Sequence, residues 1–228
     1  MKKRALVPLG AVIGLALVSW LLVGSGLFRI REISVEGGER VKPAEVRDLI
    51  GVRVGENIFL ADLGRAREAL LRLPWVRTAQ VRRALPGRVR VILEERKPCA
   101  VAALAKEQEW VDREGYLLEK APEGSGPLLR GSRALETTRG RRLDERSQLV
   151  LEALCPLGEQ FLAQFTELQL QSSSPELVLQ AKAGFRVLLD LEDLGARLRL
   201  LERLLTELRG NDYLYIDLRF GDVVLRPR

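Results

Sequence analysis

Hydrophobic positions occur at several different spacings along the chain, and the first pattern is a long run without charge. Residues 5–28, ALVPLGAVIGLALVSWLLVGSGLF, contain no charged side chain. A membrane-spanning helix needs about 20 apolar residues, whereas the apolar core of a cleaved signal peptide is only about 7–15 residues long. The run therefore predicts an uncleaved transmembrane helix over residues 5–28.

The charges on either side of this run predict its orientation. Lys2, Lys3 and Arg4 precede it, and basic residues next to a membrane helix favour the cytoplasmic side. Arg29 and Arg31 follow the run and oppose this assignment, but the first cluster is denser. We therefore predict a cytoplasmic tail over residues 1–4 and an exported region after residue 28.

Residues 29–97 predict a small α+β module in the order strand, helix, helix, strand, strand. Ile33 and Val35 alternate with polar residues, as in a half-buried strand. Helices are expected over residues 41–51, with Pro43 in the first turn, and over residues 61–74, where Asp62 precedes a periodic apolar stripe. The two remaining strands follow directly.

Those two strands form a strongly basic hairpin, LPWVRTAQVRRALPGRVRVILEERKP, over residues 73–98. Pro86-Gly87 marks the turn. Val89, Val91 and Leu93 alternate with residues of the opposite face, so one face is expected to be buried and the other solvated. The polar face either docks a partner or only keeps the protein soluble, and arginines on amphipathic elements are more often simply solvated.

Residues 98–228 predict a second, mainly antiparallel β domain with helices. Short apolar runs at 99–104, 109–112, 115–119 and 127–131 are separated by turn residues and indicate a meander. Further strands are expected at 167–172, 176–181, 185–191 and 213–227, the last bending at Gly221. Helices are predicted over residues 143–154 and 192–210. The second carries a stripe of leucines that is expected to pack into the core.

Composition narrows the classes of function. The net charge is +6, but only 5% of residues are aromatic, and basic stretches without interleaved aromatics argue against nucleic acid. No histidine is present, which removes the usual general base and the commonest metal ligand. Glu94 and Glu95 are adjacent in a strand, so their side chains point to opposite faces and cannot act on one bond. We expect no catalytic residue, metal, cofactor or small-molecule substrate.

The two cysteines, Cys99 and Cys155, leave two arrangements open. They form one disulfide if the domain lies in an oxidising compartment, or they are two buried thiols. We favour two buried thiols.

Short motifs throughout the chain resemble the FtsQ/DivIB family of bacterial cell-division proteins. The matching pieces are Val35-Glu36-Gly37, Gly55-Glu56-Asn57-Ile58-Phe59, Leu73-Pro74-Trp75-Val76 with Ala79 and Val81, Pro86, Glu94-Glu95-Arg96-Lys97-Pro98, Trp110-Val111-Asp112 with Gly115, and Ile216-Asp217-Leu218-Arg219-Phe220. No single motif is diagnostic, but their order and the single-pass anchor together are specific. The module over residues 29–97 resembles a POTRA domain.

This resemblance implies a non-catalytic scaffold of the division machinery (the divisome) at the septum. It implies a single-pass protein of the inner (cytoplasmic) membrane, with a cytoplasmic N-terminus and an extracytoplasmic bulk. The implied partners are membrane lipid, the FtsB–FtsL complex and further division proteins at the POTRA domain. The implied partner-binding residues are Asp217, Arg219, Phe220, Val223, Val224 and Leu225. Family members often have tyrosine at the position of Phe220.

Two other functions compete with this interpretation. A POTRA-containing outer-membrane transport or assembly factor would continue into a long β-barrel of alternating strands, and a leucine-stripe helix does not fit that pattern. A membrane-anchored exported enzyme would need a catalytic constellation, and the chain offers none that we recognise.

Overall fold

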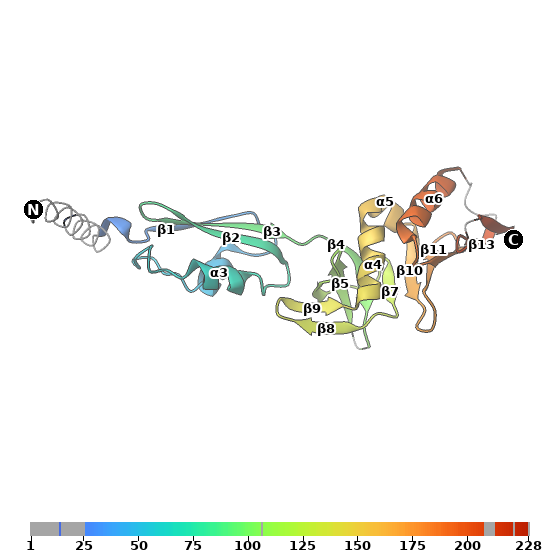
Figure 1. Cartoon of the computed structure of the whole chain (residues 1–228), viewed down its shortest axis with the longest axis horizontal. Helices are drawn as coiled ribbons and strands as arrows, with labels where there is room; N and C mark the ends of the chain where they lie inside the picture. The colour runs from blue at the N-terminus through green and yellow to red at the C-terminus, as the bar shows by residue number, and fades with distance from the viewer. Residues whose placement is uncertain (1–13, 15–25, 106, 208–212, 221, 228) are drawn as a thin grey trace, which may run out of the picture. The chain divides into compact units, whose positions relative to one another are not determined.

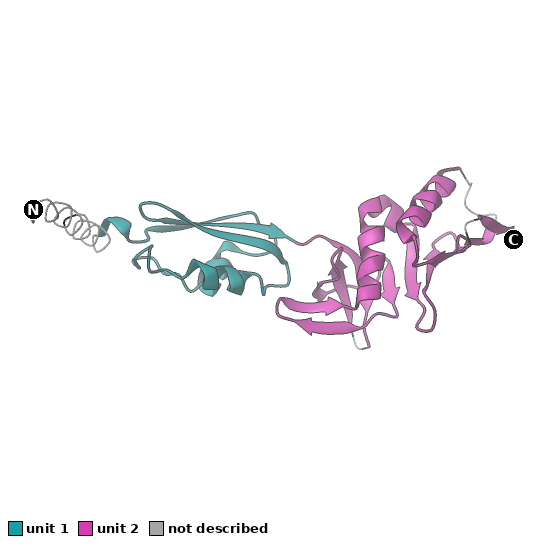
Figure 2. Cartoon of the chain, in the orientation of Figure 1, with its two compact units in different colours: residues 1–95 teal, residues 96–228 magenta. Residues whose placement is uncertain are grey.

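The computed structural model describes residues 14, 26–105, 107–207, 213–220 and 222–227. The chain divides into two compact units, Met1–Glu95 and Arg96–Arg228 (Figure 2). The predicted transmembrane helix falls almost entirely outside the described residues. Among those that are described, no helix is both long enough and apolar enough to cross a membrane.

Unit 1 has the predicted order of elements. After a 3-10 turn η1 (Gly26–Phe28) come β1 (Glu32–Glu36), α2 (Pro43–Leu49), α3 (Leu63–Leu70), β2 (Val76–Ala84) and β3 (Arg88–Glu95). The strands form a three-stranded sheet in the order β1-β3-β2, in which β1 is parallel and β2 antiparallel to β3. The sequence prediction of strand, helix, helix, strand, strand is confirmed.

Local sequence explains the helices of unit 1. Pro43 occupies the first turn of α2, and the side chain of Asp62 caps α3 by accepting a hydrogen bond from the Arg65 N–H at 2.9 Å. Ala66 and Leu70 of α3 are fully buried against Val89 and Val91 of the central strand β3. The helices thus cover one face of the sheet, and the predicted buried face of the hairpin is confirmed.

Unit 2 is built on a nine-stranded mixed sheet in the order β14-β13-β12-β11-β10-β7-β4-β5-β6. The strands are β4 (Pro98–Ala103), β5 (Gln108–Asp112), β6 (Leu117–Lys120), β7 (Leu128–Arg130), β10 (Phe165–Leu170), β11 (Glu176–Ala181), β12 (Arg186–Asp190), β13 (Tyr213–Asp217) and β14 (Val224–Pro227). The pairings β4–β7, β7–β10 and β12–β13 are parallel, and the others are antiparallel.

The meander predicted from the early strands is only partly present. The strands β4, β5 and β6 follow one another as antiparallel neighbours, but β7 returns to the other side of β4 and pairs with it in parallel. The final segment also differs from the single bent strand that we predicted. It forms two antiparallel strands, β13 and β14, because β14 folds back onto β13.

Helices cover one face of this sheet (Figure 1). They are α4 (Glu145–Leu154), the 3-10 turn η2 (Cys155–Leu157), α5 (Glu159–Leu162) and α6 (Leu194–Glu207). Leu151 of α4 and Leu198 of α6 are completely buried in one cluster with strand residues such as Leu179 and Val187. The leucine stripe of α6 therefore packs into the core, as predicted.

A separate hairpin, β8 (Ala134–Thr137) and β9 (Gly140–Leu143), was not predicted. All four residues of β8 are exposed, so this strand lacks the alternation of buried positions that identifies a strand from sequence.

The cysteines also differ from the prediction. Cys99 of β4 and Cys155 of η2 form a disulfide, with their Cα atoms 5.7 Å apart, so the prediction of two buried thiols is wrong. The pairing joins the sheet to the helix layer across 56 residues of sequence. Sequence periodicity could not reveal it, because it depends on how α4 is placed over β4.

Candidate partner-binding surface at the C-terminal sheet edge

The last strand, β14, is an edge of the nine-stranded sheet. One side of it pairs with β13, and no strand pairs with the other side among the residues that the structure describes. An edge strand leaves backbone N–H and C=O groups available to a strand from another chain. The register places Val224 opposite Asp217 and Leu225 opposite Ile216.

The segment that connects these two strands is held firmly at its start. Leu218 is buried, and its N–H donates to the Leu188 carbonyl at 2.9 Å. The guanidinium of Arg197, from α6, donates to the Leu218 carbonyl. These bonds fix the chain immediately before Arg219 and Phe220.

Arg219 is engaged within the protein. Its guanidinium donates to the Asp217 carboxylate at 2.7 Å and to the Glu176 carboxylate of β11 at 2.6 Å. These side-chain hydrogen bonds raise the pKa of Arg219, and the bond from Arg219 is the main reason that the pKa of Asp217 lies below its usual value. Arg219 and Asp217 therefore stabilise the shape of this segment.

The apolar members of the predicted set divide into two groups. Phe220 is 75% exposed, and Val223 and Val224 are exposed beside it. Leu225 instead packs against the hydrophobic core of the unit. The structure thus brings all six predicted residues together, but it leaves only Phe220, Val223 and Val224 as an exposed apolar surface.

The sheet face opposite the helices carries two further partly exposed apolar residues. The strand register aligns Val224 with Asp217, Leu188 and Val178 in a row across four strands, and each of the two inner apolar residues is partly exposed. Farther from the edge the same face is polar, with Glu167, Gln169 and Gln180 on β10 and β11. Asp217 on β13 therefore separates Val224 from the two partly exposed apolar residues of this face, Leu188 and Val178.

The sequence analysis did not identify Glu176 as part of this arrangement. It lies 43 residues before Arg219, and its own sequence context is an ordinary strand start after Pro175. No sequence signal links the two, because their contact depends on the register of β11, β12 and β13.

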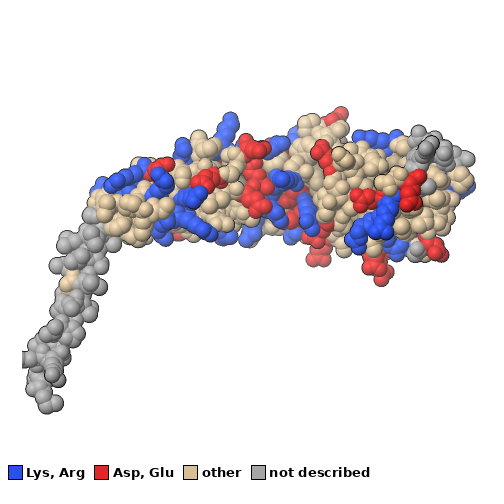
Figure 3. Space-filling view, turned by 90° about the horizontal axis from the view of Figure 1, so that it is seen from above, with Lys and Arg blue, Asp and Glu red and all other residues tan. Residues whose placement is uncertain are grey.

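The basic hairpin of unit 1 is a different kind of surface. Ion pairs connect Arg88 to Glu32 at 2.9 Å, Arg90 to Glu36 at 2.7 Å, and Arg77 to Glu94 at 3.1 Å. The hydrogen bond from Arg90 is the main cause of the lowered pKa of Glu36. Lysine and arginine side chains are interspersed with acidic ones on the face in Figure 3. Exposed pairs of this kind contribute little to stability, and this pairing favours the solvated interpretation.

Two acidic groups noted in the sequence have structural partners. Glu94 accepts hydrogen bonds from Arg77 and Thr78, whereas Glu95 accepts the backbone N–H groups of Arg40 and Val41. Burial opposes ionisation of Glu95, but these backbone bonds, with one from Glu39, outweigh it and lower its pKa. The two carboxylates serve different partners, as their strand positions predict.

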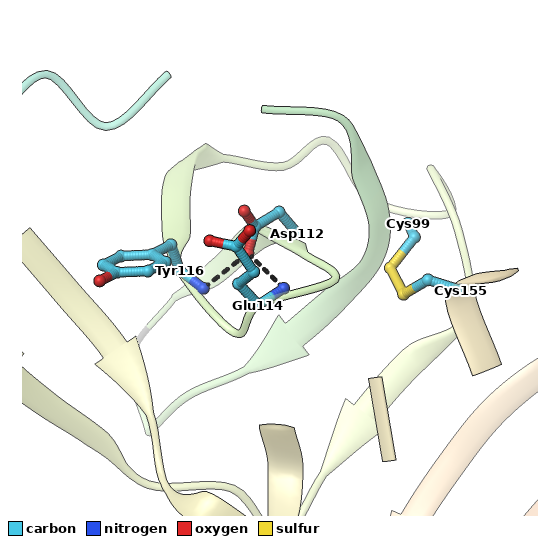
Figure 4. The surroundings of a disulfide bond; sticks show 5 residues. All are labelled: Cys99, Asp112, Glu114, Tyr116 and Cys155. Atoms are coloured by element: carbon cyan, nitrogen blue, oxygen red, sulfur yellow. Dashed lines mark hydrogen bonds between the residues drawn. A yellow bond between two sulfur atoms is a disulfide. The ribbon is translucent and has the colours of Figure 1, made fainter. Parts of the chain in front are cut away.

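Among the described residues, the most buried charges of unit 2 are those of Asp112, the last residue of β5, and Arg96. The Oδ1 atom of Asp112 accepts the backbone N–H groups of Glu114 and Tyr116 at 3.0 and 2.8 Å, near the disulfide (Figure 4). The guanidinium of Arg96 forms ion pairs with the carboxylates of Asp112 and Glu114. Within the described residues, no cluster of three or more His, Cys, Asp or Glu side chains is arranged to hold a metal ion.

Two family models match the chain. The POTRA domain, FtsQ-type, matches residues 28–96, and the cell division protein FtsQ/DivIB C-terminal domain matches residues 100–219. Together the two matches account for most of both units.

Curated relatives carry the same name. Cell division protein FtsQ of Koribacter versatilis is 30% identical over 99% of this chain and 70% of its own length, and that of Rhodothermus marinus is 30% identical over 97% and 85%. The FtsQ of an Anaeromyxobacter species is 36% identical over 68% of this chain, but the match spans only about half (53%) of that protein. A solved extracytoplasmic domain of the bacterial cell division protein DivIB from Geobacillus stearothermophilus covers 52% of this chain and 98% of its own, at 14% identity and a TM-score of 0.38.

Proposed function

The chain belongs to the FtsQ/DivIB family of cell division proteins, and from this premise we propose that it is a non-catalytic, membrane-anchored scaffold of the divisome that binds the FtsB–FtsL complex through its C-terminal strand region. The family is one of division proteins rather than of enzymes or of outer-membrane assembly factors. Its POTRA unit would bind further division proteins.

The observation that carries the binding proposal is the edge strand β14 beside the exposed Phe220, Val223 and Val224. A partner segment can add itself as a strand to such an edge, so that backbone hydrogen bonds contribute affinity and alternate side chains contribute selectivity. Phe220 is a suitable apolar anchor, because large aromatic side chains dominate the energetics of many interfaces.

The anchor proposal rests on the sequence and on the disulfide. Residues 5–28 are long enough to cross a membrane. A disulfide between Cys99 and Cys155 is typical of a domain outside the cytoplasm, because the cytosol keeps thiols reduced. N-terminal sequencing of the membrane-extracted protein should find the natural start, whereas a soluble chain that begins near Gly26 would contradict the anchor.

The binding proposal is tested by titrating the FtsB–FtsL complex onto the full chain in lipid nanodiscs. Phe220→Ala and the double variant Val223→Ser/Val224→Ser should each weaken binding by about tenfold or more, since loss of an interface anchor costs about 1–2 kcal/mol or more. Thermal unfolding should be unchanged, because these side chains are exposed.

Leu135→Ser is the matched control. Leu135 is also a large exposed hydrophobic residue of unit 2, but it lies on β8, in a different sheet. The control should bind like the wild type. If the Phe220 and Val223/Val224 variants also bind like the wild type, the docking site lies elsewhere.

A further inference from the structure

Exposed apolar side chains gather at one end of unit 1. Leu27, Val54, Phe59, Leu60 and Leu85 are all large, hydrophobic and exposed; Leu60 is 77% and Val54 65% exposed. They come from three segments that are separate in the sequence: η1, the loop before α3, and the turn between β2 and β3. Scattered exposed hydrophobics need no explanation, but a cluster of them marks an interaction site.

Backbone hydrogen bonds hold these three segments together. Ile58 N–H donates to the Phe28 carbonyl at 2.9 Å, and Ile30 N–H donates to the Glu56 carbonyl at 2.8 Å. Arg31 N–H donates to the Gly87 carbonyl at 2.7 Å, and this bond holds the hairpin turn beside the start of β1. The rings of Phe28 and Phe59 are also in contact, with centroids 5.1 Å apart. The three segments therefore form one continuous surface, which we call the entry surface.

Three arginines and one glutamate lie in the segments of the entry surface, and the Glu56 carboxylate accepts the backbone N–H of Arg53 at 3.2 Å. Among the described residues, no ion pair holds Arg29, Arg31 or Arg53. This differs from the sheet face, where Arg88 and Arg90 are paired with Glu32 and Glu36. Unpaired arginines beside exposed apolar side chains are the combination that anionic lipid attracts.

The position of the entry surface in the chain indicates what it binds. The charge-free run of residues 5–28 ends at Phe28, and Phe28 itself accepts a hydrogen bond from the loop that carries Leu60. We propose that the entry surface docks on the outer surface of the lipid bilayer, with Leu27, Val54 and Leu60 at the boundary between headgroups and acyl chains and with Arg29, Arg31 and Arg53 on anionic phosphates. This inference rests on the proposed membrane anchor.

Such docking gives the arginines after the apolar run a role. Arg29 and Arg31 lie on the side of the run where basic residues are disfavoured. At the entry surface they hold unit 1 against the headgroups, so unit 1 leaves the membrane in a defined orientation rather than on a free tether.

The test uses the full chain with a spin label at Leu60→Cys, reconstituted in nanodiscs that contain phosphatidylethanolamine and phosphatidylglycerol. Cys99 and Cys155 are joined to each other and do not compete for the label. The control label replaces Arg72, an exposed residue just beyond the other end of α3. We expect collisions of the Leu60 label with a water-soluble relaxant to be several-fold less frequent than those of the Arg72 label, and collisions with oxygen to be more frequent. The protection should decrease when phosphatidylcholine replaces the anionic lipid.

Three results would overturn the inference. The first is a Leu60 label as open to water as the Arg72 label, and the second is protection that appears only after another membrane protein is added. The third is equal protection in purely zwitterionic discs, which would contradict the docking of Arg29, Arg31 and Arg53 on anionic phosphates. A chain that does not elute with the nanodiscs would instead contradict the membrane anchor, so the two failures are distinguishable.

Discussion

The guanidinium of Arg96 lies 2.6 Å from the carboxylate of Asp112, and their side chains are only 4% and 5% exposed. The same guanidinium donates to Glu114 at 2.9 Å and lies 3.8 Å above the ring of Tyr116. Arg96 is the first residue of unit 2, so this contact fastens the start of the unit to the turn between β5 and β6.

Removing the charge of Arg96 should therefore destabilise unit 2. In Arg96→Met the carboxylate of Asp112 stays buried without its partner, and breaking a buried pair in this way costs about 3–5 kcal/mol. Chemical denaturation measures this loss when it is followed by the fluorescence of Trp110, which lies on β5, in a Trp20→Phe/Trp75→Phe background.

Lys120→Met is the matched control in the same unit, because Lys120 and its partner Glu107 are both more than half exposed. It should change the free energy of unfolding by less than about 1 kcal/mol. Equal effects of the two variants would mean that burial of the Arg96 pair has no energetic consequence.

Breaking the Cys99–Cys155 disulfide should also lower stability. The bond closes a loop with a sequence separation of 56 residues, and loops of this size lose unfolded-state entropy equivalent to about 4 kcal/mol, although measured effects are typically 2–4. Thermal unfolding with and without reductant tests this. The Cys99→Ser/Cys155→Ser variant should unfold at the lower temperature in both conditions; a reductant effect that persists in this variant would contradict the assignment.

The Asp217–Arg219 pair predicts a defined acid sensitivity. The pKa of Asp217 is lowered in the folded protein, chiefly by the hydrogen bond from Arg219. Its contribution to stability is therefore complete above the unfolded value of about 3.9 and is lost as pH falls through the folded value. Comparing the pH dependence of unfolding in the wild type and in Asp217→Asn should show a steeper decline for the wild type below about pH 4. Parallel curves would contradict this.

The Asp217–Arg219 pair also affects how a substitution of Arg219 is interpreted. Arg219→Glu would place a third carboxylate beside Asp217 and Glu176, which Arg219 now neutralises. We expect this variant to loosen the segment before Phe220, so a loss of the proposed FtsB–FtsL binding would reflect both the altered segment and the missing arginine. Amide exchange of Leu218, whose N–H is bonded to Leu188, should become faster in it.

Trp75 is predicted to be structural. It is partly buried against the core of unit 1, and the guanidinium of Arg40 lies 4.1 Å from its ring. Trp75→Ala should lower the stability of unit 1 by about 3 kcal/mol, the lower end of the range for large aromatic truncations. Circular dichroism during unfolding measures the change. Unchanged unfolding together with lost partner binding would show that the ring is a surface contact.

Local elements of this protein follow from short-range sequence patterns. The alternation of Val89, Val91 and Leu93 predicts the buried face of β3, and Asp62 predicts the start of α3. These features depend on residues two to four positions apart, where side-chain direction is set by the element itself. The order of elements in unit 1 could therefore be predicted.

The sequence indicated which residues form the candidate site, but it did not indicate how their side chains are arranged. The resemblance of residues 216–220 to the family placed the six residues, but it did not separate the exposed Phe220 from the paired Arg219. That separation depends on Glu176, which the register of β11, β12 and β13 brings to Arg219. The return of β7 beside β4 is of the same kind.

By itself, then, the sequence determined the apolar run of residues 5–28, the type of most elements and the family. Only the tertiary structure decided that Cys99 meets Cys155, that β14 is an edge, and that Arg219 is paired. The physical reason is that periodicity records which face of an element is buried, whereas contacts between distant segments depend on strand order and on how the helices pack over the sheet.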